Sequence, residues 1–271
     1  PPGSRVVATS GVPPPPPPHD APLPLPPAPP PPPPGGPPGR DRDDRSSRWG
    51  EGAGGNDRES YGASDVFSSN DLSHMSSSIQ EWCKKNEVHL PRGAPDPFIT
   101  FEEVNLPPSI MEPIGKAGFP APSPIQAASW GLAMRGADVV GVAKTGSGKT
   151  LAFLVPAFLR IMRERPDPRA GPTTLVMAPT RELATQIQDE CRKFGTAAGM
   201  TSVCLYGGAP KGGQLSEMRR GVYIIIVTPG RLNDFLEAGQ VRLDRVNYVV
   251  MDEADRMLDM GFEPQIRKIM N

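Results

Sequence analysis

The chain has 271 residues, a formal net charge of −1 and an uneven composition, since 20 of its 37 prolines lie within residues 1–39. Residues 1–97 carry 9 basic and 12 acidic side chains and residues 98–271 carry 20 and 18, so neither part offers a broad basic surface that binds nucleic acid by charge alone. The three cysteines and three histidines are scattered without metal-ligand spacing, which argues against a zinc site and is typical of buried thiols in a reducing compartment. The sequence contains neither a transmembrane run nor a signal peptide, which favours an intracellular protein.

The first part of the chain, residues 1–95, is predicted to be a disordered tail rich in proline, glycine and serine. It contains the runs Pro13–Pro18 and Pro29–Pro34, and residues 40–80 hold few apolar side chains. Such a segment buries too little apolar surface to offset its chain entropy, and its proline runs favour polyproline II. Proline runs of this kind bind the aromatic grooves of SH3 or WW domains, or act only as a solvated spacer. Because the chain begins at Pro1 and not at Met, we expect it to be a fragment.

From residue 98 onward, short apolar runs alternate with segments of helical period. The runs are nearly continuous in apolar residues, as expected for parallel strands covered on both faces, and comprise Asp138–Val142, Thr173–Ala178, Ser202–Tyr206, Val222–Val227 and Asn247–Met251. The helical segments are Thr150–Arg163, Glu182–Phe194, Gln214–Arg219 and Arg231–Leu236. Repeated β-α units predict an α/β fold with a mostly parallel sheet and helices on both faces, and with ligands at the carboxyl ends of the strands.

A glycine-rich segment follows the first predicted strand and opens the first predicted helix. Its last three residues match the phosphate-loop ending G-K-[ST], while an alanine replaces the first glycine of the usual pattern. Backbone N–H groups of such a loop bind phosphates, its lysine reaches the terminal phosphates, and the hydroxyl of its last residue can bind magnesium. The predicted nucleotide-binding residues here are Ala143, Lys144, Thr145, Gly146, Ser147, Gly148, Lys149 and Thr150.

Acidic residues follow the last predicted strand. Asp252 and Glu253 stand at the end of a buried apolar run, where an acidic pair needs a cation or another partner. We expect Asp252 to hold magnesium together with Thr150, and Glu253 to orient and deprotonate an attacking water. ATP and Mg²⁺ are therefore the predicted cofactors, and Glu253, Asp252 and Lys149 are the predicted catalytic residues.

Several strings, in order over roughly residues 98–271, resemble the DEAD-box RNA helicase family. Gly118-Phe119 followed by P-S-P-I-Q (residues 122–126), with Phe101 upstream, resembles the family's adenine-reading Q motif, which spans about residues 99–127. P-T-R-E-L-A (residues 179–184), G-G (207–208), T-P-G-R (228–231) and D-E-A-D (252–255) resemble further motifs. The strings at 206–212 and 252–266 are most similar to the nuclear, ribonucleoprotein-remodelling branch, which favours the nucleus over the cytoplasm. The departures are Ser123, Lys144 and Gly213 where the family more often has threonine, glutamine and proline.

The resemblance implies a RecA-like lobe of an RNA-dependent ATPase that unwinds short duplexes or removes proteins from RNA. Gln126 would read the adenine edge, while Phe101 or Phe119 would stack on the base or serve instead as a core anchor. The residues implied for sequence-independent contact with the RNA backbone are Pro179, Thr180, Arg181, Gly207, Gly208, Thr228 and Arg231. Asp255 would relay the nucleotide state to the RNA side.

Two other functions remain open on the sequence: a P-loop kinase or DNA-directed motor, and a non-catalytic clamp or interaction protein. In the family, the strand after the D-E-A-D helix lies between the phosphate-loop strand and the acidic strand. This sequence stops at Asn271, before that strand. We therefore expect a truncated first lobe that is inactive and poorly folded alone.

Overall fold

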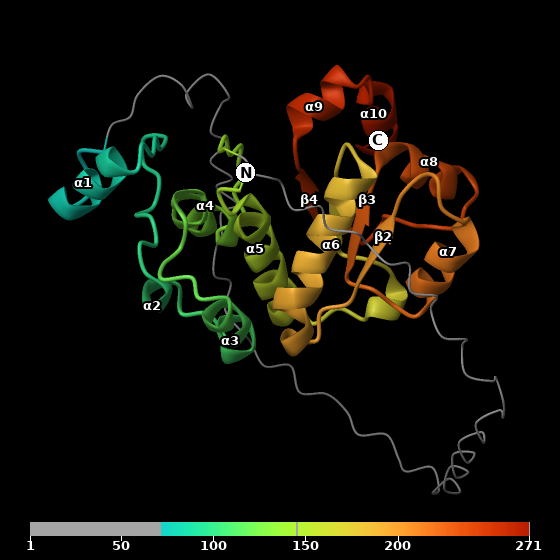
Figure 1. Ribbon diagram of the computed structural model, residues 1–271, viewed down its shortest axis with the longest axis horizontal. Helices are drawn as coiled ribbons and strands as arrows, with labels where there is room; N and C mark the ends of the chain where they lie inside the picture. Colours follow the sequence, from blue (N-terminus) through green and yellow to red (C-terminus); the bar gives the residue numbers. More distant parts are fainter. Residues whose placement is uncertain (1–71, 145, 271) are drawn as a thin grey trace, which may run out of the picture. The chain divides into compact units, whose positions relative to one another are not determined.

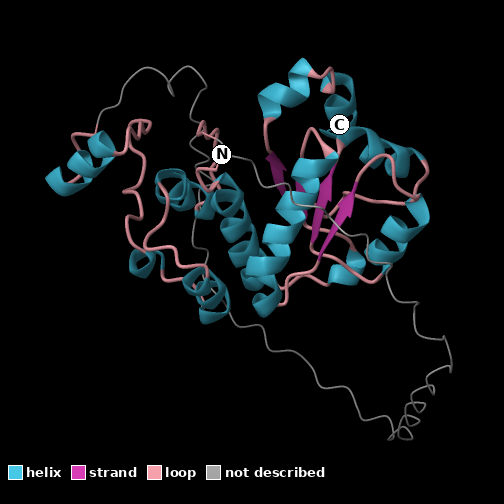
Figure 2. Cartoon of the chain, viewed as in Figure 1, coloured by secondary structure: helices cyan, strands magenta, loops and turns pink. Residues whose placement is uncertain are grey.

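The computed structural model describes residues 72–144 and 146–270 (Figures 1 and 2). Its sheet has four strands, namely β1 Thr174–Met177, β2 Ser202–Leu205, β3 Ile224–Val227 and β4 Tyr248–Met251. They run in the order β2-β3-β1-β4, and every neighbouring pair is parallel. The predicted α/β class with a parallel sheet is thereby confirmed, and the four strands lie within four of the five predicted runs.

Helices connect the strands and flank the sheet (Figure 1). They are α5 Lys149–Glu164, α6 Arg181–Gly195, α7 Lys211–Arg219, α8 Pro229–Glu237, α9 Ala254–Asp259 and α10 Glu263–Met270, with two 3₁₀ turns, η1 Pro168–Ala170 and η2 Thr196–Ala198. Four of these helices overlap the predicted helical segments and begin one to three residues earlier, because each starts at the residue after its N-cap and not at the first apolar position.

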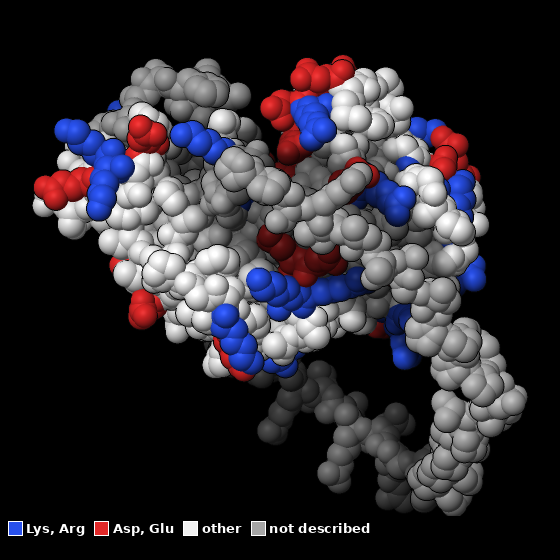
Figure 3. Space-filling model, in the orientation of Figure 1, with Lys and Arg blue, Asp and Glu red and all other residues white. Residues whose placement is uncertain are grey.

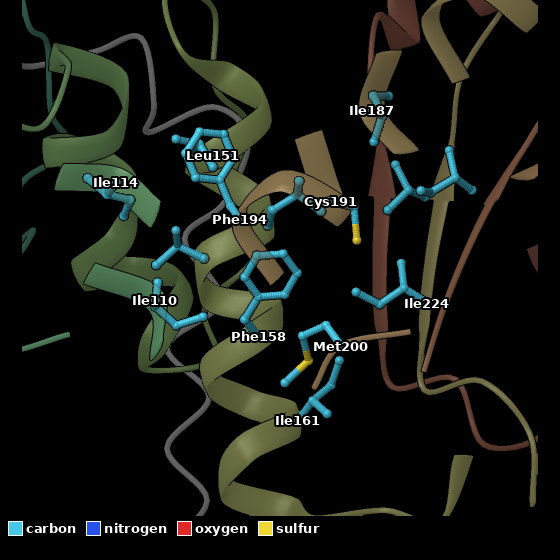
Figure 4. Close-up of a cluster of buried hydrophobic side chains, with 14 of the residues drawn as sticks. Ile110, Ile114, Leu151, Phe158, Ile161, Ile187, Cys191, Phe194, Met200 and Ile224 are labelled. Carbon is cyan, nitrogen blue, oxygen red and sulfur yellow. The ribbon is translucent and has the colours of Figure 1, made fainter. Parts of the chain in front are cut away.

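Side chains of each strand point alternately to the two faces of the sheet, so the strands contribute to two separate hydrophobic cores. Val176, Ile224 and Ile226 face a cluster built with α3, α5 and α6, which Figure 4 shows around Phe158 and Phe194. Their neighbours Leu175 and Ile225 face a second cluster on the opposite side, built with α8 and residues after β4. Both faces are apolar, which is why the strands read as continuous apolar runs in the sequence.

Among the described residues, four helices precede the phosphate loop: α1 Ser77–Lys85, α2 Phe101–Val104, α3 Pro108–Lys116 and α4 Pro124–Met134. The first of them falls inside the predicted disordered tail. Residues 72–95 have their own small core of Met75, Cys83, Val88, Leu90 and Ala94, which packs against Ala128 of α4. The prediction of disorder therefore fails for residues 72–95, because a few spaced apolar side chains suffice where a neighbouring helix supplies the other half of the core. The proline runs lie outside the described residues.

The predicted strand Asp138–Val142 is not formed. This segment is extended but pairs with no strand in the described part of the chain, and Val140 and Val142 are 83% and 90% exposed. On the sheet, β4 pairs only with β1, and Val249 and Met251 are 39% and 47% exposed. A strand needs a hydrogen-bonded neighbour, so an apolar run without one stays unpaired however strong its propensity.

Among the residues described, none of the helices combines the length and apolarity needed to cross a bilayer.

Candidate nucleotide site and nucleic-acid interface

The predicted RNA-binding and acidic residues follow the carboxyl ends of the four strands, whereas the phosphate loop and Gln126 precede the first of these strands in the chain. Thr180 and Arg181 follow β1, Gly207 follows β2, Thr228 follows β3 and Asp252 follows β4. Because the strands are parallel and ordered β2-β3-β1-β4, the segments after β2, β3 and β1 are neighbours, and the acidic segment lies on the other side of β1. The sheet thus places the predicted RNA residues and the predicted magnesium residue along one edge.

The phosphate loop leads directly into α5. Gly146 and Gly148 have φ of 78° and 89°, in the left-handed region that favours glycine. A Cβ added to Gly148 would lie 2.6 Å from Nε2 of Gln126, so this position also requires a glycine for space. The Lys149 ammonium donates a hydrogen bond to the carbonyl of Ala143 (2.9 Å), which closes the loop on itself. Thr145 lies outside the described residues.

Two serine hydroxyls in this region fit a phosphate ligand. Ser147 Oγ in the loop and Ser123 Oγ before α4 are buried and have no hydrogen-bond partner among the described residues. Buried hydroxyls are normally satisfied, so each can take a hydrogen bond from or give one to a bound group. These hydroxyls, the loop amides and the Lys149 ammonium are all groups that can bind an anion.

Oxygen ligands for a cation surround the start of α5. Asp252 is 9% exposed, and burial raises the pKa of its carboxyl, while the charge of Lys149 opposes that shift. Glu190 of α6 also has a pKa raised by burial, and its carboxylate accepts a hydrogen bond from the Thr150 hydroxyl. Carboxylate and hydroxyl oxygens suit Mg²⁺, so Thr150 and Asp252 fit the ion they were predicted to hold. Glu190 was not predicted, because no motif marks a glutamate in the middle of a helix.

Glu253 has an unusual backbone for its residue type. Its φ is 51°, and it forms the N-cap of α9. The Glu253 amide donates to Oδ1 of Asp252 (3.1 Å), and its carboxylate pairs with Arg256 (3.0 Å). A non-glycine residue held in this region costs free energy, and such strain is concentrated at functional sites. Asp255, the predicted coupling residue, is exposed in the first turn of α9.

Gln126 joins the segment before α4 to the phosphate loop. Its Oε1 accepts from the amide of Ser123 (3.0 Å) and its Nε2 donates to the carbonyl of Gly148 (3.0 Å). The oxygen and the nitrogen of its side-chain amide are therefore both hydrogen-bonded within the chain, and the residue is 6% exposed. Of the two phenylalanines, Phe101 is 7% exposed beside Trp130, as a core residue is, whereas Phe119 is 44% exposed beside Phe194.

On the predicted RNA side, charge is confined to a few positions. Arg181 is exposed, with its guanidinium 4.7 Å from the ring centroid of Tyr206, and Gly207 and Gly208 are exposed in the following loop. Thr180 caps α6 by accepting from the amide of Leu183 (3.2 Å). Pro179 is buried and Thr228 is half-buried. Figure 3 shows acidic and basic side chains interspersed on the face it displays.

Arg231 differs from the other predicted RNA residues, because it is 8% exposed. Its guanidinium donates two hydrogen bonds to the carbonyl of Ala209 (3.0 and 3.1 Å) and one to Oε1 of Gln214 (3.3 Å). The arginine is thus occupied by the loop that carries Gly207 and Gly208. The sequence could not show this, since the partners come from two other elements.

Comparisons with known proteins agree with these motifs. The sequence profile of the DEAD/DEAH box helicase family matches residues 123–271. ATP-dependent RNA helicase-like protein DB10 of Nicotiana sylvestris is 54% identical over 213 residues, covering 78% of this chain and 34% of that protein. DEAD-box ATP-dependent RNA helicase 46 of Arabidopsis thaliana is 56% identical over 195 residues, covering 72% of this chain and 30% of that protein.

Solved structures give the same result. The RNA helicase Prp28 of Chaetomium thermophilum bound to ADP matches with a TM-score of 0.62 and 43% identity, over 65% of this chain and 44% of that one. The yeast DEAD-box splicing factor Prp28 matches with a TM-score of 0.68 and 33% identity, over 73% and 48%. The chain spans about a third of the length of the two plant relatives. It belongs to the DEAD/DEAH box helicase family, of which it forms a RecA-like first lobe.

Proposed function

We propose that the protein to which this chain belongs is an ATP-dependent RNA helicase, which hydrolyses ATP with Mg²⁺ to unwind short duplexes or remodel ribonucleoproteins. The observation that carries the proposal is the shared sheet edge: the acidic segment after β4 and the segments after β1, β2 and β3 lie side by side. A nucleotide and an RNA strand bound there would both contact the segments around β1. The proposed reaction is that of the family, and the shared edge of the sheet would bring the nucleotide and the RNA close together.

At the nucleotide, each residue has a role that its chemistry supports. Lys149 would leave the Ala143 carbonyl and bind the terminal phosphates, while Ser147 and the loop amides bind the remaining oxygens. Thr150 and Asp252 would hold Mg²⁺, which neutralises phosphate charge when bound. Glu253 would orient the attacking water and accept its proton. Gln126 would exchange its bond with Gly148 for the adenine edge, beside the exposed Phe119.

At the RNA, contact would be with the backbone. Arg181 and the exposed glycines after β2 can approach phosphates closely. Thr180 and Thr228 are the N-caps of helices whose amino ends favour anions, and Pro179 directly precedes Thr180. Such contacts carry no base information, so binding would be independent of sequence. Asp255, exposed next to the catalytic pair, would link the two sides.

Two further proposals concern the whole protein. We place it in the nucleus, because the strings at residues 206–212 and 252–266 are those of the nuclear branch. The proline runs would recruit SH3- or WW-type domains, in addition to helicase work. Imaging of the tagged protein tests the first assignment, and binding of the isolated 1–71 peptide to such domains tests the second.

The central test is ATP turnover by the full-length protein with single-stranded RNA, with DNA of the same sequence, and without nucleic acid. We expect RNA alone to stimulate turnover, and Lys149→Ala to abolish it. Equal stimulation by DNA would favour a DNA-directed motor, and turnover indifferent to both would favour a kinase-like enzyme. ATP-dependent RNA binding without turnover would favour a clamp.

A further inference from the structure

The loop that carries Gly207 and Gly208 is held by side chains. In the described part of the chain, the ladder hydrogen bonds of the sheet end before residues 206–210, where Gly207 and Gly208 form a tight turn. Two of its carbonyls are bound instead by buried side chains from helices: Gln214 Nε2 donates to the Tyr206 carbonyl (3.1 Å), and Arg231 donates to the Ala209 carbonyl. These two anchors lie on either side of the glycine pair.

The two anchors are also bound to each other. Arg231 of α8 donates to Oε1 of Gln214 of α7 (3.3 Å), and the two residues are 8% and 9% exposed. Asp234 forms ion pairs with Arg231 (3.7 Å) and with Lys211 (3.1 Å). Both ends of the Gln214 amide are therefore used: Nε2 donates to the loop, and Oε1 accepts from the arginine that also binds the loop.

The same glutamine acts on the segment after β1. The Tyr206 carbonyl that it binds belongs to the residue whose ring carries the Arg181 guanidinium, 4.7 Å from the centroid. A shift of Tyr206 would therefore move the platform beneath Arg181 as well as the adjacent glycines. The buried pair thus binds the segment after β2 directly, is linked to Arg181 after β1 only through Tyr206, and includes Arg231 of the segment after β3.

From this arrangement we infer that Gln214 and Arg231 form a buried brace that sets the RNA-binding conformation of residues 206–210, and that neither needs to touch RNA. The inference rests on the proposed RNA function. Glycine loses more conformational freedom on ordering than any other residue, so a loop with two adjacent glycines would bind RNA weakly if it had to be ordered each time. The brace orders it in advance, and Gln214 is thereby a positioning residue.

The test compares Gln214→Leu and Arg231→Lys with Asn233→Leu in the full-length protein. Asn233 is the matched control, because it is a buried amide on α8 (7% exposed) that donates to the Gln265 carbonyl (3.1 Å), away from the loop. We expect the two brace variants to raise the Kd for single-stranded RNA and the KM for RNA about tenfold, the scale of one lost buried hydrogen bond. The KM for ATP, and kcat at saturating RNA, should stay within about twofold.

Two further measurements separate a brace from general damage. The double variant Gln214→Leu with Arg231→Lys should weaken RNA binding less than the product of the single effects, because both act on one loop. Without RNA, amide exchange in residues 206–210 should be faster in Gln214→Leu than in Asn233→Leu. Wild-type RNA affinity in Gln214→Leu, or an equal loss of ATP and RNA affinity, would overturn the inference. If the wild-type protein binds no RNA, the proposed function fails instead, and unchanged loop exchange in Gln214→Leu would then overturn the brace as well.

Discussion

At the scale of single residues, three functional side chains of this lobe are hydrogen-bonded to main-chain carbonyls. Lys149 is bound to Ala143, Gln126 to Gly148, and Arg231 to Ala209. When a ligand binds, each of these hydrogen bonds is either kept or replaced by a bond to the ligand. Ligand affinity therefore depends on the difference in free energy between the bonds that are lost and the bonds that are gained. The residue-scale predictions use that difference.

Gln126→Glu should reduce the preference for ATP over GTP. The substitution replaces an amide donor by a carboxylate acceptor, which removes one of two bonds to the adenine edge, worth about 1–3 kcal/mol of discrimination. It also removes the bond to the Gly148 carbonyl, which the free protein makes and which either nucleotide would replace, so this change shifts both affinities alike. The ratio of the two affinities isolates the first effect, and an unchanged ratio would remove Gln126 from the adenine site.

Arg181→Ala should weaken RNA binding about equally for all RNA sequences and reduce the slope of log Kd against log salt concentration by about one. The reason is that an exposed arginine over Tyr206 can meet a phosphate but has no base-reading partner. Arg242→Ala is the control, since Arg242 is an exposed arginine that pairs only with Asp244. A loss confined to particular RNA sequences would show that Arg181 reads bases.

At the scale of elements, the sequence predicted the features that depend on local residue patterns. It missed the features that depend on contacts with residues far along the chain. Strands β1 to β3 were predictable because both of their faces are buried, which leaves continuous apolar runs, and β4 is an apolar run as well, although Val249 and Met251 are exposed. Helix α1 was missed, because its small core is completed by Ala128 far along the chain. The segment Asp138–Val142 has the composition of a strand but lacks a neighbour. The partners of Gln126, Glu190 and Arg231 come from separate elements, so no spacing in the sequence announces them.

The packing of β4 on α5 predicts a loss of stability in alkali. The Tyr248 hydroxyl donates to the Phe153 carbonyl (3.2 Å), and burial raises its pKa from 10.0 to about 12, against the opposing charge of Arg160. Because the unfolded tyrosine ionises first, the free energy of unfolding should fall as the pH rises from 10 toward 12. Tyr248→Phe should flatten that fall, whereas Tyr223→Phe should not. Denaturant titrations across this pH range measure the free energy of unfolding. An unchanged pH dependence of that free energy in Tyr248→Phe would contradict the role given to Tyr248.

The exposed edges predict poor folding of residues 98–271 alone. Val140, Val142 and Met251 are exposed, and the outer edge of β4 is unpaired. We expect this segment to aggregate or melt without a cooperative transition. A version extended through the strand that the family places between β4 and residues 138–142 should melt sharply. Calorimetry with sedimentation measures both, and a sharp, monomeric transition of the short segment would contradict the expectation.

At the scale of the whole molecule, one edge of the sheet carries residues proposed for both ligands, ATP and RNA. The lobe has nearly balanced charge, with 20 basic and 18 acidic side chains in residues 98–271, so long-range attraction cannot supply its RNA affinity. Affinity would come instead from loops positioned at the strand ends, which β1 connects to the acidic segment. Nucleotide and RNA binding should then depend on each other.

The most direct measurement is the RNA affinity and ATP turnover of Glu253→Gln in the full-length protein, with Lys149→Ala beside it. Removing only the basicity of Glu253 should leave ATP binding nearly intact and stop turnover, so that ATP with Mg²⁺ holds the protein on RNA. Lys149→Ala should instead lose ATP binding and, with it, any effect of ATP on RNA affinity. The account predicts tight, ATP-dependent RNA binding with no hydrolysis in Glu253→Gln; hydrolysis at the wild-type rate, or RNA affinity indifferent to ATP, would contradict it.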